Sequence, residues 1–356
     1  MKRMFCLVFL TFFGITLLAQ PANYYNSANG LTGNQLKVAL HNIIKGHTSI
    51  SYSQIWNAYW STDNKGNGVV WDMYSDRPNG TPAYTFYLGQ DECGSGGYSG
   101  EGDCYNREHS WPQSWFNEQS TPRTDLHHIF PTDGWVNNKR SNYPFGEVRS
   151  AEWTSTNGSK LGTCKTTGYS GTVFEPIDEY KGDFARAMMY MSVRYYGEDS
   201  GWKTSDMTNK SEIKSWAIDM LLRWNDLDPV SQKEIDRNNA IYNDYQHNRN
   251  PFVDHPEYAR MIWDSSWSFA EEVVDEPIYI FPNPVEKGNV IHLSGNEWKF
   301  DAVAIYDLCG HVVAKTSGFS LGGLCITVPE GMQTGLYFVK LMKNGRVVKN
   351  LKLDVR

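Results

Sequence analysis

The spacing of apolar residues predicts several helices between residues 21 and 270. Apolar positions recur at helical intervals in three segments, 36–43, 184–195 and 213–224. Ser231 followed by Glu234 forms a capping-box pattern, which predicts the start of a further helix. This part of the chain should therefore be rich in helix.

Shorter runs with β-forming residues occur in the same part of the chain. They cover residues 69–74, 84–88 and 104–109, and the last run stops near Pro112. A glycine-rich loop over residues 94–102 lies between them. Together with the helices, these runs predict an α+β fold for residues 21–270.

The pattern changes after an acidic linker at residues 271–277. Short apolar or alternating runs follow at 278–281, 303–306 and 336–341, separated by Gly, Asn and Pro. Strands bounded by such turn residues predict a small all-β sandwich over residues 278–356. The expected order is thus an α+β domain followed by a β domain.

The first 20 residues have the order of a secretory signal. Lys2 and Arg3 precede an apolar stretch that ends near Leu18, which is shorter than the ~20 residues that a membrane span needs. We expect cleavage after Ala19 or Gln20; a membrane anchor is the alternative. The mature protein should carry no span and be extracellular or held at the cell surface.

Secretion makes disulfides chemically plausible. Cys93 with Cys104, and Cys309 with Cys325, are the pairs that the spacing suggests, and Cys164 is then left over. Sequence alone does not fix this connectivity.

Composition excludes a disordered chain, because 40% of its residues are hydrophobic and 14% are aromatic. The net charge is −7. Residues 21–276 hold 22 basic and 34 acidic residues, a net charge of −12. Proteins that bind nucleic acid usually show a basic surface, so a nucleic acid would have to bind in a local cleft. The basic residues near the polar clusters described next are Arg107, Arg123, Lys139 and Arg140.

Polar residues that could form a site concentrate in segments 106–112, 125–142 and 248–257. Mg²⁺ prefers a few carboxylate or amide oxygens together with water, and Glu108 with Asn137 or Asn138 could supply them. His109 titrates near neutral pH and could take a proton from water. Successive strand residues point to opposite faces, so Glu108 and His109 can share a site only where the strand ends or kinks.

Three segments resemble the secreted endonuclease I family: CYNREHSWPQSWF (104–116), DLHHIFPTDGWVNNKRSNYPFGE (125–147) and residues 228–257. The resemblance implies a non-specific endonuclease with a ββα-metal (His-Me finger) core, acting on DNA and possibly RNA and leaving 5′-phosphates. It implies His109 as general base and Glu108 and Asn137 as Mg²⁺ ligands.

The same resemblance implies roles for further residues. Asp125 and His127 match positions that frame the site and are not themselves catalytic, and we group Asn138 with them. The family uses an arginine near the cleaved phosphate, for which Arg123 and Arg140 are the candidates.

FPNP (281–284), residues 335–340 and the closing stretch 349–355 resemble a type IX secretion sorting domain. This resemblance implies a contact with secretion machinery; a carbohydrate-binding module is the alternative. For the whole chain, the alternative is a surface adhesin or polysaccharide-binding protein without catalysis. We expect a monomer.

Overall fold

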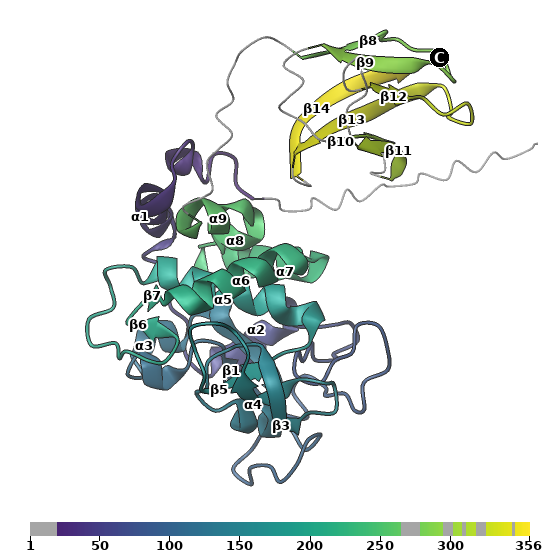
Figure 1. Ribbon diagram of the computed structural model, residues 1–356. Coiled ribbons are helices and arrows are strands. Elements are labelled where there is room, and N and C mark those ends of the chain that lie inside the picture. The colour runs from purple at the N-terminus through teal and green to yellow at the C-terminus, as the bar shows by residue number, and fades with distance from the viewer. Residues whose placement is uncertain (1–19, 265–277, 295–301, 308–310, 318–324, 344–345) are drawn as a thin grey trace, which may run out of the picture. The chain divides into compact units, whose positions relative to one another are not determined.

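A computed structural model describes residues 20–264, 278–294, 302–307, 311–317, 325–343 and 346–356. The chain divides into two compact units, Met1–Trp267 and Ser268–Arg356 (Figure 1). The expected signal segment up to residue 19, the linker at 271–277 and Cys309 lie outside the described residues.

The first unit contains the described α-helices and seven of the described strands, which alternate along the chain in mixed order. Its helices are α1 (Gly33–Ile44), α2 (Gln54–Thr62), α3 (Ser120–Arg123), α4 (Gly134–Arg140), α5 (Lys181–Arg194), α6 (Ser215–Leu227), α7 (Gln232–Ala240), α8 (Pro251–Asp254) and α9 (Glu257–Trp263). Its strands are β1 (Tyr105–His109), β2 (Ile129–Asp133), β3 (Val148–Thr154), β4 (Lys160–Cys164), β5 (Thr172–Glu175), β6 (Thr208–Asn209) and β7 (Glu212–Ile213). The expectation of a mixed α+β protein is confirmed.

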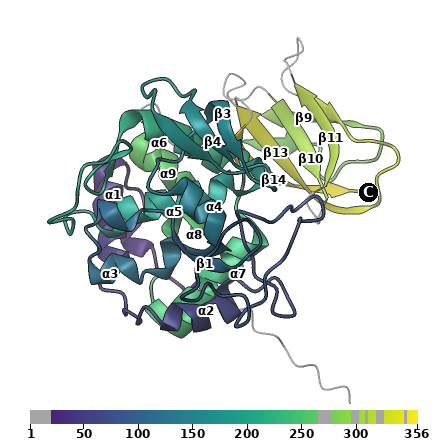
Figure 2. The ribbon, with the colours of Figure 1, turned by 90° about the horizontal axis from the view of Figure 1, so that it is seen from below.

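Helix α5 is the centre of this unit. Every residue from Gly182 to Arg194 is buried, as expected for a helix that is covered on all sides. Helices α1, α6 and α8 pack against it, and Figure 2 shows it enclosed by them. The helices expected from segments 36–43 and 184–195 are present, and α7 begins with the expected capping box of Ser231 and Glu234. In segment 213–224, Ile213 belongs to β7, and α6 starts only at Ser215.

Strands β1 and β2 form an antiparallel pair that leads directly into α4. Glu108 lies opposite Phe130, and His109 lies opposite Ile129. Asp133 ends β2 and caps α4, because its carboxylate accepts a hydrogen bond from the Val136 N–H at 2.8 Å. Two strands and a helix therefore follow one another around the segment that carries the polar residues.

Two expected strands are wrong. Residues 69–74 and 84–88 contain only isolated bridges, such as Val69 with Tyr87. The Asp72 carboxylate accepts hydrogen bonds from the Tyr74 N–H and the Ser75 hydroxyl, at 2.8 and 2.6 Å. A short acidic side chain that captures nearby donors in this way favours a turn over a continuing strand.

The expected strand at 104–109 is present as β1, and Cys93 forms a disulfide with Cys104 just before it. That expected pairing is confirmed. Cys164 is a free, buried thiol. Strands β3, β4 and β5 form a separate antiparallel sheet, and β6 pairs with β7.

The second unit consists of two sheets in the part that the structure describes. Strands β11 (Val312–Ser317), β10 (Ala302–Tyr306), β13 (Gly335–Lys343) and β14 (Arg346–Val355) form one sheet, and β12 (Cys325–Thr327), β9 (Val290–Ser294) and β8 (Tyr279–Phe281) form the other. Ile280 and Ile291 from the smaller sheet share one buried core with Val303 and Val339 from the larger one. None of the described helices of the chain is long and apolar enough to cross a membrane.

Candidate active site

The end of β1 and helix α4 border a polar cavity of about 600 Å³. Its lining includes Glu108 and His109 from β1, Asn137 from α4, and Tyr52 and Arg107. Residues that are distant in sequence are thus brought to one place by the β1–β2–α4 segment.

Alternation along β1 sorts its side chains into two groups. Asn106 and Glu108 face α4, where they contact Asn137 and Arg140. Arg107 and His109 share the other face, where both lie beside Tyr52. His109 is the last residue of the strand, so both faces meet at the same cavity. The expected end of the strand at Glu108 and His109, which allows both side chains to reach one site, is thus observed.

Glu108 is almost completely buried, and two donors meet at its Oε1 atom. The Tyr74 hydroxyl donates to it at 2.8 Å and Arg140 Nη1 donates at 2.9 Å. Burial raises the pKa of the Glu108 carboxyl, and the Arg140 charge and the Tyr74 hydrogen bond oppose that rise.

His109 is held by the backbone of a neighbouring segment. Its Nε2 lies 3.1 Å from the Arg123 carbonyl oxygen; because a carbonyl can only accept, this contact places the proton on Nε2 and leaves Nδ1 as the basic nitrogen. Burial, with His128 adding to it, lowers the pKa of His109 to about 3, although the carbonyls of Arg123 and Arg107 oppose the change. The imidazole is therefore neutral at neutral pH.

Asn137 points its amide toward Asn106. Asn137 Nδ2 donates to Asn106 Oδ1 at 2.6 Å, so Asn137 Oδ1 remains available as an acceptor. Asn138, by contrast, is exposed and is not part of the cavity lining. Asn106 and Tyr74 had no assigned role in the sequence analysis, and nothing in their local sequence marks them, because their partners lie 31 and 34 residues away.

The donor set fits a hard divalent cation. The Glu108 carboxylate and the Asn137 amide oxygen are the ligand types that Mg²⁺ accepts, and the cavity has room for the waters that Mg²⁺ retains. The described residues contain no cluster of three or more His, Cys, Asp or Glu side chains that could hold a metal. A site made from one carboxylate and one amide would thus depend on water and substrate for its other ligands.

The two candidate arginines lie in different environments. Arg140 is buried, and its two terminal nitrogens donate to Glu108 and to the carbonyls of His109 and Ser110. The Arg123 guanidinium lies 4.1 Å from the Tyr52 ring centroid, and its Nε donates to Gln113 Oε1 at 2.9 Å. Arg140 is in the cavity wall, so the structure brings it to the site as a partner of Glu108.

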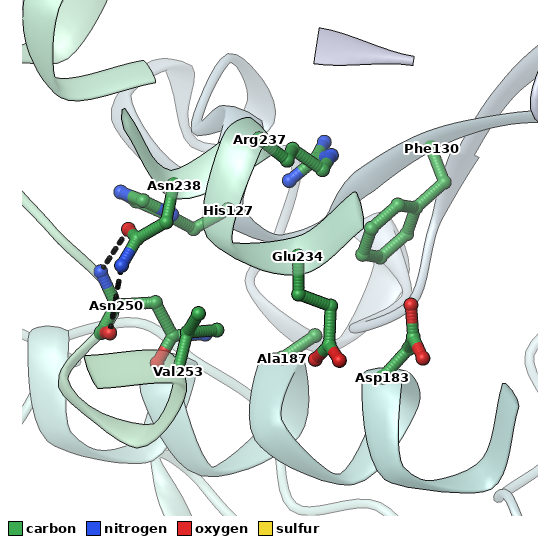
Figure 3. Close-up of a pocket in the computed structure, with 9 residues that line it drawn as sticks. All are labelled: His127, Phe130, Asp183, Ala187, Glu234, Arg237, Asn238, Asn250 and Val253. Atoms are coloured by element: carbon green, nitrogen blue, oxygen red, sulfur yellow. Dashed lines mark hydrogen bonds between the residues drawn. The ribbon is translucent and has the colours of Figure 1, made fainter. Parts of the chain in front are cut away.

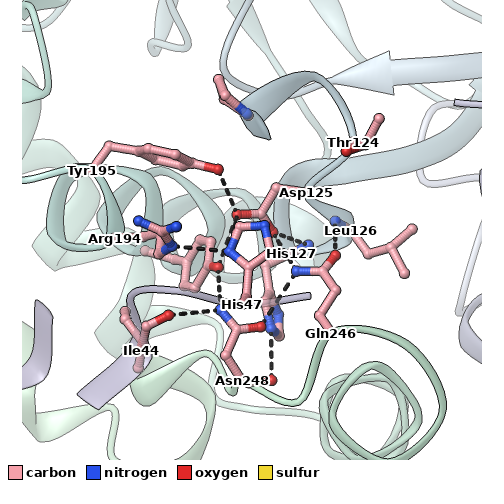
Figure 4. Close-up of polar contacts among 12 residues, drawn as sticks. Ile44, His47, Thr124, Asp125, Leu126, His127, Arg194, Tyr195, Gln246 and Asn248 are labelled. Carbon is pink, nitrogen blue, oxygen red and sulfur yellow. Dashed lines mark hydrogen bonds and ion pairs between the residues drawn. The ribbon is translucent and has the colours of Figure 1, made fainter. Parts of the chain in front are cut away.

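Asp125 and His127 belong to a separate buried cluster and do not line the cavity (Figure 4). They lie at the 3₁₀ helix η3 (Leu126–His128), which Asp125 caps by accepting a hydrogen bond from the His127 N–H at 3.2 Å. Asp125 accepts hydrogen bonds from the hydroxyls of Tyr190 and Tyr195, at 2.9 and 3.0 Å. Burial disfavours its charge, but His47 and then His127 hold the pKa of Asp125 below its ordinary value.

A second cavity, between α5, α7 and α8, has room for about one water molecule, at about 20 Å³ (Figure 3). Its acidic residues are already paired, Asp183 with Lys233 and Glu234 with Arg186. Asn238 and Asn250 hydrogen-bond across it. It is therefore a well-paired part of the core.

Comparisons with known proteins match the two units separately. The Endonuclease I family model matches residues 32–257, and the model of the secretion system C-terminal sorting domain matches residues 279–353. The chain is 41% identical over 255 residues to an "Extracellular ribonuclease" from Bacillus amyloliquefaciens, which covers 70% of this chain and 81% of that protein.

Two further relatives also have names that denote nucleases. An "Extracellular ribonuclease" from Bacillus subtilis (strain 168) is 38% identical over 251 residues, covering 69% of this chain and 80% of that protein. An "Endonuclease-1" from Buchnera aphidicola subsp. Acyrthosiphon pisum (strain APS) is 26% identical over 131 residues, covering 36% and 44%. The chain therefore belongs to the endonuclease I family of nucleases and carries a secretion-system sorting domain, which indicates that it is secreted.

Proposed function

We propose that this nuclease is a metal-dependent endonuclease of the ββα-metal type, with His109 as general base and Mg²⁺ held by Glu108 and Asn137. The observation that carries the proposal is that these three side chains, from β1 and α4, line one polar cavity. Family membership and this cavity favour hydrolysis over the alternative of a binding protein without catalysis.

Each of the residues at the cavity has its own proposed role in the reaction. His109, with its proton on Nε2, presents Nδ1 to an attacking water and takes its proton. Arg140 orients the Glu108 carboxylate. When bound, Mg²⁺ would stabilise the charge that develops on the phosphate and the leaving oxygen. Arg123, whose carbonyl is hydrogen-bonded to His109, contacts the cleaved phosphate.

The substrate class is RNA as well as DNA, with 5′-phosphate products. Two relatives are named extracellular ribonucleases, which supports RNA as a substrate. Because residues 21–276 carry a net charge of −12, binding depends on a few local cations and should weaken strongly as salt rises. Asp125 and His127 take no part in the reaction and support the surrounding structure, and the exposed Asn138 takes no part in it either.

The proposed chain organisation is a signal segment at 1–20, a catalytic domain at 21–270, a linker at 271–277 and a sorting domain at 278–356. The mature protein acts outside the cell as a monomer, after the sorting domain has engaged the secretion machinery.

A metal titration tests the proposal. Protein treated with EDTA should not degrade RNA or DNA, and Mg²⁺ should restore activity. Glu108→Gln should raise the Mg²⁺ concentration for half-maximal activity by at least about tenfold, whereas Glu152→Gln, at an exposed position on β3, should match the wild type. Activity that persists in EDTA, or a Glu108→Gln titration that matches the wild type, would refute the metal site.

A further inference from the structure

Two arginines beside the cavity lie in an alternating stack with aromatic rings. The Arg107 Cζ atom lies 3.7 Å from the Tyr52 ring centroid and 4.3 Å from that of Trp56. Arg123 Cζ lies 4.1 Å from the same Tyr52 ring. Two planar guanidinium groups this close to one centroid would overlap on a single face, so they cover opposite faces of Tyr52. We name the series Trp56–Arg107–Tyr52–Arg123 the arginine stack.

The charges of the arginine stack are not neutralised by the described part of the chain. Neither Arg107 nor Arg123 forms an ion pair there, unlike Arg140 with Glu108. Their hydrogen bonds go to neutral acceptors: Arg107 Nη1 donates to the Tyr52 carbonyl at 2.9 Å, and Arg123 Nε donates to the Gln113 side chain. These bonds fix orientation and leave the charge uncompensated.

One donor in the stack is also unsatisfied. Arg107 Nε is buried and has no hydrogen-bond partner among the residues that the structure describes. A buried N–H without a partner is costly, and two unpaired cations stand out in a region of net charge −12. Because Arg107 Nε is closed to solvent, it is the two unpaired charges that indicate an anionic ligand from outside the chain.

The stack lies within reach of the reacting groups. Tyr52 and Arg107 line the same cavity as His109, and the Tyr52 and His109 ring centroids are 6.2 Å apart with an interplanar angle of 23°. The two guanidinium carbons are at most about 8 Å apart. Neighbouring phosphates of one strand can contact two cations at that separation.

We propose that the arginine stack holds two consecutive phosphates of a nucleic-acid strand, with Arg123 at the cleaved phosphate and Arg107 at its neighbour. Tyr52 is a positioning residue, because its ring keeps the two cations apart and fixes their planes. The guanidinium edges donate to phosphate oxygens while the rings cover their faces. This inference rests on the proposed nuclease function.

Short substrates test it. The value of kcat/KM is measured for a dinucleoside monophosphate, which has one phosphate, and for a trinucleoside diphosphate, which has two. For the wild type, the second phosphate should raise kcat/KM about tenfold to hundredfold, the range for a charge-assisted contact. Arg107→Ala and Tyr52→Leu should each remove most of this rise. Tyr52→Phe should retain it, and so should Arg223→Ala, which changes an exposed arginine on α6.

A binding measurement separates charge from fold. In a His109→Ala background with EDTA, Arg107→Ala should lower the salt slope of single-strand binding by about 0.7, and Arg107→Lys should restore it in part. The inference is overturned if the wild type shows no rise with the second phosphate, or if the rise survives both Arg107→Ala and Tyr52→Leu. If the wild type cleaves no nucleic acid of any length, the nuclease proposal itself is wrong.

Discussion

Glu108 is a buried carboxylate whose charge depends on one cationic neighbour. Arg140 donates to it and also to two backbone carbonyls at the end of β1. A buried ion pair contributes little to folding stability compared with a pair of apolar side chains, but removing one partner leaves a buried charge uncompensated. The geometry of the whole site therefore depends on a side chain that has no need to touch the substrate.

Removal of this partner should be costly. We predict that Arg140→Ala lowers the free energy of unfolding by about 3–5 kcal/mol, measured by urea denaturation. In a Glu108→Gln background, where no buried charge remains, the same substitution should cost clearly less. Equal losses in both backgrounds would show that the ion pair is not what Arg140 stabilises.

Single residues also show how far sequence alone can lead. Glu108, His109 and Asn137 were predicted from their chemistry and from the family resemblance, and the structure places all three at one cavity. Asn106, Tyr74 and Tyr52 were not, since each acquires its contact only when distant segments fold together. Asn138 differs from Asn137 by one helical position, which turns its side chain to solvent.

At the scale of elements, the helices follow from sequence better than the short strands do. The capping box at α7 and the apolar periodicity of α5 are local signals, and the structure has both. Segments 69–74 and 84–88 have strand-like composition. Side chains such as Asp72, however, accept hydrogen bonds from nearby backbone N–H groups, and only isolated bridges form there. The amino-acid composition of a short segment does not show whether a side chain will take backbone N–H groups away from strand pairing.

The disulfide supports the element that carries the site. Cys104 immediately precedes β1, and its carbonyl accepts from the Gly134 N–H at the start of α4. The two cysteines are 11 residues apart in sequence, a loop for which closure entropy gives about 2–3 kcal/mol. We predict that Cys93→Ser/Cys104→Ser loses that much stability in urea unfolding. Dithiothreitol should lower the wild-type transition equally and leave the variant unchanged; a wild type insensitive to the reductant would contradict this role.

At the scale of the whole molecule, buried histidines make stability depend on pH. Burial lowers the pKa of His127 and of His128 to about 4 in each case, partly opposed by Asp125. In the unfolded chain each would titrate near its ordinary value of 6.5. Their contribution is thus complete above pH 6.5 and is lost as the pH falls toward 4, because the unfolded state then binds more protons.

This coupling between protonation and folding predicts a measurable loss of stability at acidic pH. Between pH 7.5 and pH 5, we predict that the free energy of unfolding falls by about 2 kcal/mol for each of these two histidines. Urea denaturation at both pH values measures it. His128→Gln should reduce the difference, and His311→Gln, at an exposed position of the second unit, should not. A stability that does not change over this range would contradict neutral buried imidazoles.

The most direct test of the account is nicking of supercoiled plasmid, with a parallel RNA substrate, by the wild type, His109→Ala and His311→Ala. We predict that the wild type and His311→Ala cut in Mg²⁺ and are inactive in EDTA. His109→Ala, folded by its thermal transition, should be slower by about 10²- to 10⁴-fold in Mg²⁺. Full activity of a folded His109→Ala variant, or wild-type cutting in EDTA, would contradict the proposed mechanism.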